Sequence, residues 1–117
     1  MDHAGDDLLS VRREVNDRAV MIHAVGEVDH ATASRLSAEL TNAVRDTTPT
    51  QVIVLDLNGI SFLGSAGLAV LVEHHRHSQR NGRDLRIVVS NTMVRRSLQR
   101  TGLIQLLQVH DTLGETH

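Results

Sequence analysis

The chain of 117 residues carries a formal net charge of −2 at pH 7, with histidine counted as neutral, and contains no cysteine, no lysine and one aromatic residue, Phe62. The length suits a single domain, and the absence of cysteine excludes disulfides and thiolate metal sites. The absence of lysine excludes a lysine-dependent phosphate loop, and a single aromatic side chain on an acidic chain argues against a nucleic-acid partner.

No apolar run approaches the roughly 20 residues that a membrane-spanning helix requires. The first seven residues are acidic and lack the apolar stretch of a secretory signal. We therefore expect a cytoplasmic protein with no membrane partner. Residues 8–110 are expected to form one domain, and residues 1–7 and 111–117 are expected to be flexible termini.

Two apolar segments open the predicted domain. Residues 8–15 alternate between apolar and polar side chains, and residues 19–25 form a nearly continuous apolar run. The pair Asn16-Asp17 between them is typical of a tight turn. This pattern predicts two neighbouring antiparallel strands.

A helix is predicted to follow the segment 26–29, which ends the second strand. Asp29 can accept hydrogen bonds from the free N–H groups of a first helical turn, so it is the predicted N-cap. An apolar stripe at helical spacing follows, formed by Ala33, Leu36, Leu40 and Val44. The polar segment 47–50, which contains the single proline, is predicted to end this helix.

The centre of the chain predicts a strand, a loop and a helix. Residues 52–57 are largely apolar, which is typical of a parallel strand buried on both faces. Residues 56–63 are predicted to form a loop, with a turn at Asn58-Gly59. A helix is predicted from Ser65 to Arg80 and is expected to stop at Asn81-Gly82. Its predicted inward stripe consists of Leu68, Leu71, Val72 and His75.

The last part of the chain predicts a strand over residues 85–89, a third helix capped by Ser90 or Thr92 and closed by Gly102, and a short strand over residues 104–109. The predicted inner side of the third helix consists of Met93, Val94, Ser97 and Leu98. The resulting order, β-β-α-β-α-β-α-β, indicates an α/β fold in which helices cover a mixed but mostly parallel β-sheet.

The carboxyl ends of parallel strands meet at one edge of a sheet. Three connections, 26–30, 56–64 and 90–92, are therefore expected to share that edge, together with the N-terminal ends of the helices that follow them. Free N–H groups and the helix dipole make such an edge favourable for an anion. Ser65 is predicted to lie in it, with Glu27, Asp29 and Asn58 as neighbours.

Several segments resemble the anti-sigma factor antagonists of bacteria, which are single STAS domains. They are Gly26-Glu27-Val28-Asp29, then Val54-Leu55-Asp56-Leu57 with Ile60-Ser61-Phe62-Leu63-Gly64-Ser65-Ala66-Gly67-Leu68, then Ser97-Leu98 with Thr101-Gly102-Leu103. Their order and spacing match the family over nearly the whole chain, which implies the STAS fold.

The resemblance implies a switch without catalysis and without a cofactor. Its partners would be an anti-sigma factor that is also a serine kinase, and a phosphatase that resets the switch. Binding of the antagonist releases a sigma factor for transcription, and phosphorylation of a serine at the start of the central helix ends the binding. By alignment, the implied acceptor is Ser65. Gly64 replaces the family's acidic residue, and Ala66 replaces the family's second hydroxyl residue.

The partner-binding surface implied by the resemblance is built around the acceptor. It consists of Glu27, Asp29, Asn58, Gly64, Ser65, Ala66, Gly67 and Leu68. Other interpretations remain open: Ser65 as a plain helix cap, an unphosphorylated STAS scaffold, a sensor of a small ligand or nucleotide, and a hydrolase that uses Ser65. The hydrolase elbow requires glycine two residues before the serine, where this chain has Leu63.

Two further clusters favour structural interpretations. His74 and His77 share a helix face that His30 or Glu73 could join, but adjacent histidines point in different directions, so a solvated face is favoured over a metal site. In this interpretation His75 faces inward and the other two face solvent. The arginines of the third helix, Arg95, Arg96 and Arg100, are likewise expected to form a solvated face.

Overall fold

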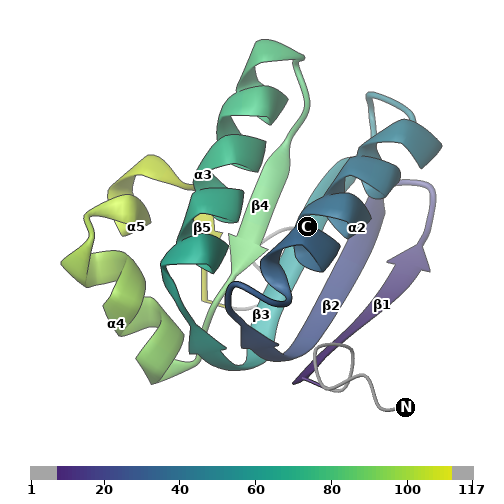
Figure 1. Cartoon of the computed structure of the whole chain (residues 1–117). Coiled ribbons are helices and arrows are strands. Elements are labelled where there is room, and N and C mark those ends of the chain that lie inside the picture. Colours follow the sequence, from purple (N-terminus) through teal and green to yellow (C-terminus); the bar gives the residue numbers. More distant parts are fainter. Residues whose placement is uncertain (1–7, 112–117) are drawn as a thin grey trace, which may run out of the picture.

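A computed structural model describes residues 8–111 as a five-stranded sheet with helices packed against it (Figure 1). The predicted flexible termini lie outside the described residues, apart from Asp111. The strands are β1 (Leu9–Val15), β2 (Ala19–Val28), β3 (Val52–Leu63), β4 (Leu85–Val88) and β5 (Val109–His110). The helices are α2 (Ala33–Asp46), α3 (Ser65–Arg80), α4 (Thr92–Arg100) and α5 (Leu103–Leu106).

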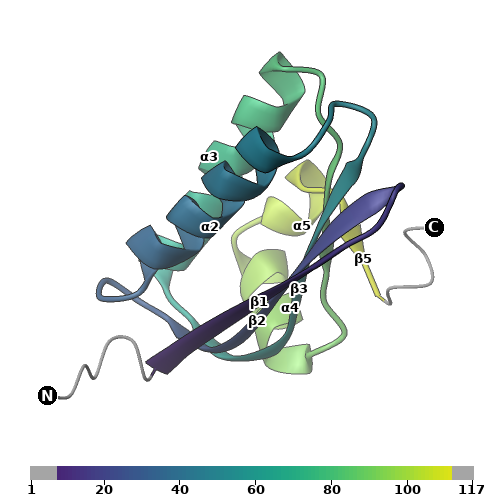
Figure 2. The same ribbon diagram turned by 90° about the vertical axis from the view of Figure 1, so that its right-hand side faces the viewer.

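The strands lie in the sheet in the order β1-β2-β3-β4-β5. β1 is antiparallel to β2, whereas the pairs β2–β3, β3–β4 and β4–β5 are parallel. This arrangement confirms the predicted mixed, mostly parallel α/β fold. Helices α2 and α3 pack against each other on one face of the sheet, as Figures 1 and 2 both show.

The core lies between this helical layer and the inward side chains of the central strands. In β2, Val20, Ile22 and Ala24 are at most 1% exposed, whereas the residues between them are half-buried, which is the period of two that a strand requires. Leu36 and Leu40 of α2 lie opposite and are equally buried. Burial of each such leucine contributes about 1.5–3 kcal/mol, so the core fixes α2 and α3 over the sheet.

The predicted loop over residues 56–63 is wrong, because β3 continues through it to Leu63. The pairing of β3 with β2 shifts twice, between His23 and Val25 and between Gly26 and Glu27, so β3 carries extra residues as bulges. The predicted turn at Asn58-Gly59 is wrong for the same reason. A Cβ atom at Gly59 would lie 2.8 Å from Val25 Cγ2, so glycine permits the close approach at the first bulge.

Two predictions for the end of the chain also need correction. The cap of α4 is Asn91, whose side chain accepts from the backbone N–H groups of Met93 and Val94, and Met93 is 48% exposed instead of inward. The predicted strand over residues 104–109 begins as helix α5, and only Val109 and His110 form β5. The half-buried Leu103 and the buried Leu107 are four residues apart, which is helical spacing.

The inward face of α3 is broader than predicted. Leu71 and His75 are buried as expected, but Leu68 and Val72 are only half-buried. His74 was predicted to face solvent and is instead 8% exposed, because this side of α3 packs against α2. The buried residues of α3 are Gly67, Val70, Leu71, His74, His75 and Ser78.

Candidate functional site

The three predicted connections do meet at one edge of the sheet, at the lower end of the view in Figure 1. The backbone N–H of Gly64 donates to the carbonyl of Val28 at 2.9 Å, which joins the end of β3 to the end of β2. The side-chain amide of Asn91 donates to the carbonyl of Ile60 at 2.6 Å, which joins the segment after β4 to β3. These bonds tie the start of α3 to the end of β2, and the start of α4 to β3, at the same edge of the sheet.

Ser65 is the first residue of α3, and Gly64 occupies the N-cap position. The Ser65 side chain forms no capping hydrogen bond, so the interpretation of Ser65 as a plain helix cap is wrong. The residue is exposed, and its hydroxyl has no hydrogen-bond partner within residues 8–111. The first N–H groups of a helix lack partners inside the helix, so this hydroxyl lies beside a local concentration of donors.

A hollow of about 190 Å³ surrounds Ser65. It is lined by Asp29, His30, Phe62, Gly64, Ser65 and Ala66. The structure therefore brings Asp29 and Ser65 together as predicted. It also adds His30 and Phe62, which lie in the predicted connections 26–30 and 56–64 but were not among the individually predicted site residues. The position of His30 next to Asp29, and the status of Phe62 as the single aromatic residue of the chain, were the available signals.

Asp29 accepts hydrogen bonds in the turn that precedes α2, and not at the N-cap position of α2 that the sequence predicts. Its carboxylate oxygen Oδ1 accepts from the backbone N–H groups of Ala31 and Thr32 at 2.9 and 3.1 Å. Helix α2 itself begins at Ala33, with Thr32 in the N-cap position. The predicted interaction is therefore present, but Asp29 organises the turn before the helix. The Thr32 hydroxyl donates to the carbonyl of Glu27 at 2.8 Å, which fixes the same segment to the end of β2.

The other predicted neighbours lie outside the hollow. Asn58 is hydrogen-bonded to Ser90: its carboxamide oxygen accepts from the backbone N–H and from the hydroxyl of that residue. Glu27 pairs in the sheet with Phe62 and is half-buried. Leu68 is also half-buried and packs against the core. These three residues support the edge, whereas Ser65 and Asp29 line its opening.

The glycines on either side of Ser65 serve different purposes. A Cβ atom at Gly67 would lie 2.5 Å from Leu63 Cδ1 and 2.7 Å from Val28 Cγ1, so glycine lets α3 begin directly against the ends of β2 and β3. A Cβ atom at Gly64 would lie 3.0 Å from Cε2 of the Phe62 ring. The backbone of Gly64 is extended, with φ of −87°, so the ring and not the backbone favours glycine there.

The hollow contains one exposed serine hydroxyl, and it lacks a nucleophile–base pair among the described residues. Within the described part of the chain no hydrogen bond joins Ser65 to His30, and serine attack on a substrate requires such a base. The histidines of α3 lie apart from this hollow. His74 and His77 line a different cavity, and residues 8–111 contain no group of three histidines or carboxylates placed to hold a metal ion.

The arginines of α4 are not all free solvated side chains. Arg95 forms an ion pair with Asp111 at 2.5 Å and donates to the carbonyl of Val89 at 3.1 Å, so it fastens α4 to the end of the sheet. Arg96 and Arg100 are exposed, as predicted. Over the described range, no helix is long and apolar enough to cross a membrane.

Known proteins share both the sequence pattern and the fold. The STAS domain family matches residues 10–116. The anti-sigma-F factor antagonist RsfA of Mycobacterium tuberculosis (strain ATCC 25618 / H37Rv) is 36% identical over 97 residues, which cover 83% of this chain and 76% of that relative. A solved anti-sigma factor antagonist from Mycobacterium paratuberculosis is 27% identical and superposes with a TM-score of 0.82 over 94% of this chain and 92% of its own. The unphosphorylated form of SpoIIAA is 21% identical and has the same fold, with a TM-score of 0.72 over 92% of this chain and 91% of its own. This chain therefore belongs to the STAS domain family.

Proposed function

We propose that this protein is an anti-sigma factor antagonist: it binds an anti-sigma factor and so releases a sigma factor for transcription. The observation that carries the proposal is the exposed Ser65 hydroxyl at the first position of α3, beside Asp29 and in a shallow hollow. A relative that is 36% identical bears the name of an anti-sigma-F factor antagonist, which points in the same direction. Transcription takes place in the bacterial cytoplasm, which is the location we propose.

The proposed partner surface surrounds Ser65. Phe62 is 48% exposed and lines the hollow, so a partner could bury its ring at little expense to the fold. Aromatic side chains near the centre of an interface contribute much of its binding free energy. We assign the contact to the hollow residues Asp29, Phe62, Gly64, Ser65 and Ala66, supported from behind by Glu27, Asn58, Gly67 and Leu68.

Phosphorylation of Ser65 is the proposed regulation. A phosphoserine adds about −1.5 to −2 charges at pH 7. At the first turn of α3 the free N–H groups and the helix dipole favour this charge, so the antagonist itself would stay folded. A partner surface fitted to a small hydroxyl would lose the contact through steric exclusion and desolvation of the phosphate. The enzymes in this cycle would be the anti-sigma factor acting as serine kinase and a separate phosphatase.

Gly64 and Ala66 are the two positions beside Ser65 at which this chain differs from the usual family pattern. Gly64 offers no carboxylate beside the acceptor, but Asp29 lines the same hollow and brings one from the neighbouring segment. Ala66 offers no second hydroxyl, so Ser65 is the single acceptor in the hollow. In this proposal the protein binds and is modified, and performs no catalysis of its own.

A binding experiment with three variants tests the proposal. Purified wild type, Ser65→Ala and Ser65→Asp would be titrated against each anti-sigma factor of the source bacterium. We expect one of them to bind wild type and Ser65→Ala, and to bind Ser65→Asp at least about tenfold more weakly, a difference of about 1.4 kcal/mol. Thr50→Asp is the matched control. Thr50 is exposed and lies just before the first residue of β3, whereas Ser65 follows the last residue of this strand.

The outcomes separate the two parts of the proposal. If no anti-sigma factor binds the wild type, the antagonist function is wrong. If one binds, but Ser65→Asp binds as tightly as Thr50→Asp, the protein is an unphosphorylated scaffold and the switch is wrong. Incubation of the complex with ATP, followed by intact-mass measurement of wild type and Ser65→Ala, then shows whether Ser65 accepts a phosphate.

A further inference from the structure

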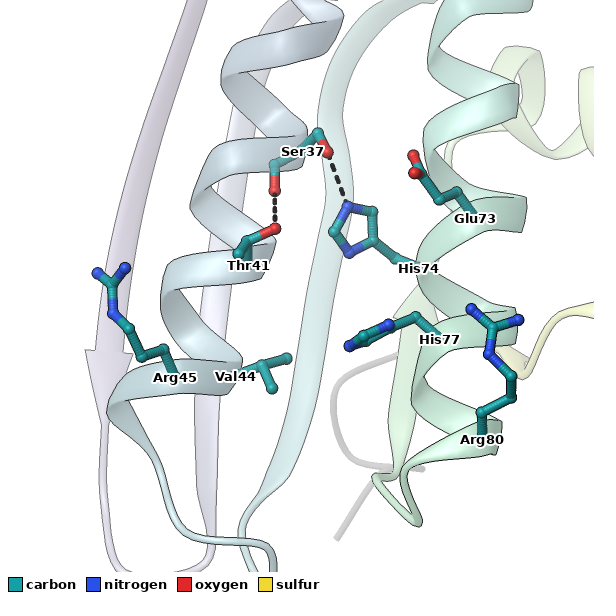
Figure 3. A pocket seen from close by; sticks show the side chains of 8 residues that line it. All are labelled: Ser37, Thr41, Val44, Arg45, Glu73, His74, His77 and Arg80. Atoms are coloured by element: carbon teal, nitrogen blue, oxygen red, sulfur yellow. Dashed lines mark hydrogen bonds between the residues drawn. The ribbon is translucent and has the colours of Figure 1, made fainter.

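A second cavity, of about 330 Å³, lies between α2 and α3 and shares no lining residue with the hollow around Ser65. Its walls are Ser37, Thr41, Val44 and Arg45 of α2, and Glu73, His74, His77 and Arg80 of α3 (Figure 3). Its volume is at the lower end of the range of about 300–1,000 Å³ that is typical of small-molecule sites. The cavity thus has room for a small ligand.

A hydrogen-bonded pair spans the two helices at this cavity. The Nε2 atom of His74 lies 2.8 Å from the hydroxyl oxygen of Ser37, and His74 is 8% exposed. The Thr41 hydroxyl donates to the carbonyl of Ser37 at 3.0 Å. The dashed lines in Figure 3 mark these two interactions: the first joins the ring of His74 to α2, and the second lies within α2.

Two donor side chains at the cavity, Arg80 and His77, have no partner in the described part of the chain. Within residues 8–111, neither the Arg80 guanidinium nor the His77 imidazole forms a hydrogen bond or an ion pair. The Arg45 guanidinium turns away from α3 toward Asp46, with Nε 3.4 Å from the Asp46 carboxylate, so Arg45 lines the wall with its hydrocarbon stem (Figure 3). Glu73 is the only acid among the lining residues. Glu73, Arg80 and His77 are all exposed, and Glu73 likewise has no partner in the described range. With two arginines against one carboxylate, the lining carries a net positive charge, which favours an anion.

The protonation of His74 is sensitive to what the cavity contains. Burial lowers the pKa of His74, the nearby His77 lowers it further, and Glu73 opposes both effects. Arg45 is the one titratable group that α2 contributes to the lining, and Glu73, His77 and Arg80 are those of α3 besides His74. An anion in the cavity would favour the protonated imidazole and so raise the pKa of His74.

We propose that this cavity is a binding site for a small organic anion that carries a carboxylate or phosphate group. Arg80 supplies a planar guanidinium that matches either group, and His77 supplies a second donor from the same face of α3. Val44 on the opposite wall contacts the apolar part of the ligand, and the Ser37–His74 pair contacts it at the inner side. This site is independent of the proposed function at Ser65.

NMR of the histidine rings in the full chain tests the site. Sodium succinate and sodium phosphate are the probes, each compared with sodium chloride at the same ionic strength. We expect a saturating shift of the His74 and His77 signals with at least one probe, and an upward shift of the pKa of His74 at saturation. The probe that saturates identifies the recognised group as a carboxylate or a phosphate.

Arg80→Gln is the diagnostic variant, and we expect it to bind the probe at least fivefold more weakly. Arg100→Gln is the matched control, because it removes the same charge from an exposed position on α4 that lines neither cavity. His77→Gln provides a second test and should also weaken binding. Shifts that stay linear for both probes, or equal affinities in Arg80→Gln and Arg100→Gln, would overturn the proposal.

Discussion

The carboxamide oxygen of Asn58 accepts two hydrogen bonds from Ser90, one from its backbone N–H at 2.6 Å and one from its hydroxyl at 2.9 Å. This pair ties β3 to the segment that leads into α4, at the sheet edge that carries Ser65. A side chain that sequence reasoning assigned to a turn therefore supports the geometry of the candidate site.

We expect Asn58→Ala to loosen this edge. Each lost hydrogen bond contributes about 0.5–1.5 kcal/mol, and both donors at Ser90 lie near solvent, so the free energy of unfolding should fall by about 1 kcal/mol. Denaturant unfolding measures the fall, and amide hydrogen exchange should quicken at Ser90 more than at residues of β1. Unchanged exchange at Ser90 would show that the pair does not stabilise this edge.

Gly67→Ala should destabilise the fold despite the higher helix propensity of alanine. The new methyl group would lie within 2.7 Å of both Leu63 Cδ1 and Val28 Cγ1, and overpacking of this kind costs about 1–3 kcal/mol, against a propensity gain of about 1 kcal/mol. Thermal unfolding should give a lower midpoint. Gly64→Ala is the comparison, because its methyl group meets the movable end of the Phe62 ring, so its midpoint should fall less.

Phe62→Ala should weaken binding to the anti-sigma factor about tenfold or more, if the proposed partner surface is right. The ring is 48% exposed, so its removal should change stability little. Val15→Ala serves as the control, because Val15 is 59% exposed at the opposite end of the sheet, on the strand that runs antiparallel to β2. Equal affinities for the two variants would place the contact elsewhere.

Stability should decrease as pH falls from about 7.5 to 5.5, partly because of His74. Burial lowers the pKa of His74 in the folded state below its value in the unfolded chain, so the unfolded chain binds the proton more readily. The stabilising contribution is therefore complete above the unfolded pKa near 6.5, and it is lost as pH falls toward the folded pKa. One such group changes the free energy of unfolding by at most about 1.4 kcal/mol for each pH unit.

His74→Gln should flatten this pH dependence. Glutamine can still hydrogen-bond Ser37, so the variant removes the titration while it keeps a polar link between α2 and α3. Denaturant unfolding at several pH values provides the measurement. His30→Gln is the matched control for the loss of a histidine, since His30 is exposed on a different segment. Parallel slopes in the wild type and in His74→Gln would assign the pH dependence to other groups.

Arg86→Gln should reduce stability at neutral pH and weaken its dependence on acid pH. The hydrogen bond from Arg86 is the main cause that lowers the pKa of Asp84, with a further contribution from Gln108. Asp84 is therefore stabilising above the unfolded pKa, and this contribution disappears as pH falls through the folded pKa. The pair is partly exposed, so its effect should stay below about 1 kcal/mol. Arg96→Gln is the exposed control for urea unfolding at pH 7 and pH 3.

The general position of the candidate site could be predicted because it depends on topology. Parallel strands separated by helices bring their carboxyl ends to one edge, and the small residues around Ser65 mark the start of a helix. The same reasoning could not predict that residues 56–63 continue β3. The bulges in this segment depend on how β3 pairs with β2, which the local sequence does not show. For this reason the sequence predicts a turn at Gly59, whereas in the structure Gly59 permits close packing against Val25.

Side-chain environments were harder to predict than elements. The burial of His74 depends on the angle at which α3 packs against α2, and periodicity along α3 alone did not contain that information. His30 and Phe62 entered the hollow because the turn after Asp29 and the extended end of β3 lie side by side. By contrast, the Asn81-Gly82 stop and most of the apolar stripe of α2 follow from local rules: Gly82 has a positive φ, and Ala33, Leu36 and Leu40 are buried as predicted. The fourth buried residue of α2 is Ala43, and the predicted Val44 is half-buried.

Gly64, and not Ser65, occupies the capping position of α3, and the Ser65 hydroxyl gives no hydrogen bond to the fold. A phosphate on that oxygen would therefore replace no internal interaction. Because the free N–H groups and the dipole at the start of α3 favour its charge, the phosphorylated form would be at least as stable as the unmodified one, and a protease that degrades unfolded chains would not remove it faster. Phosphorylation would then end the binding of the partner without exposing the antagonist to degradation, so that removal of the phosphate restores the same molecule.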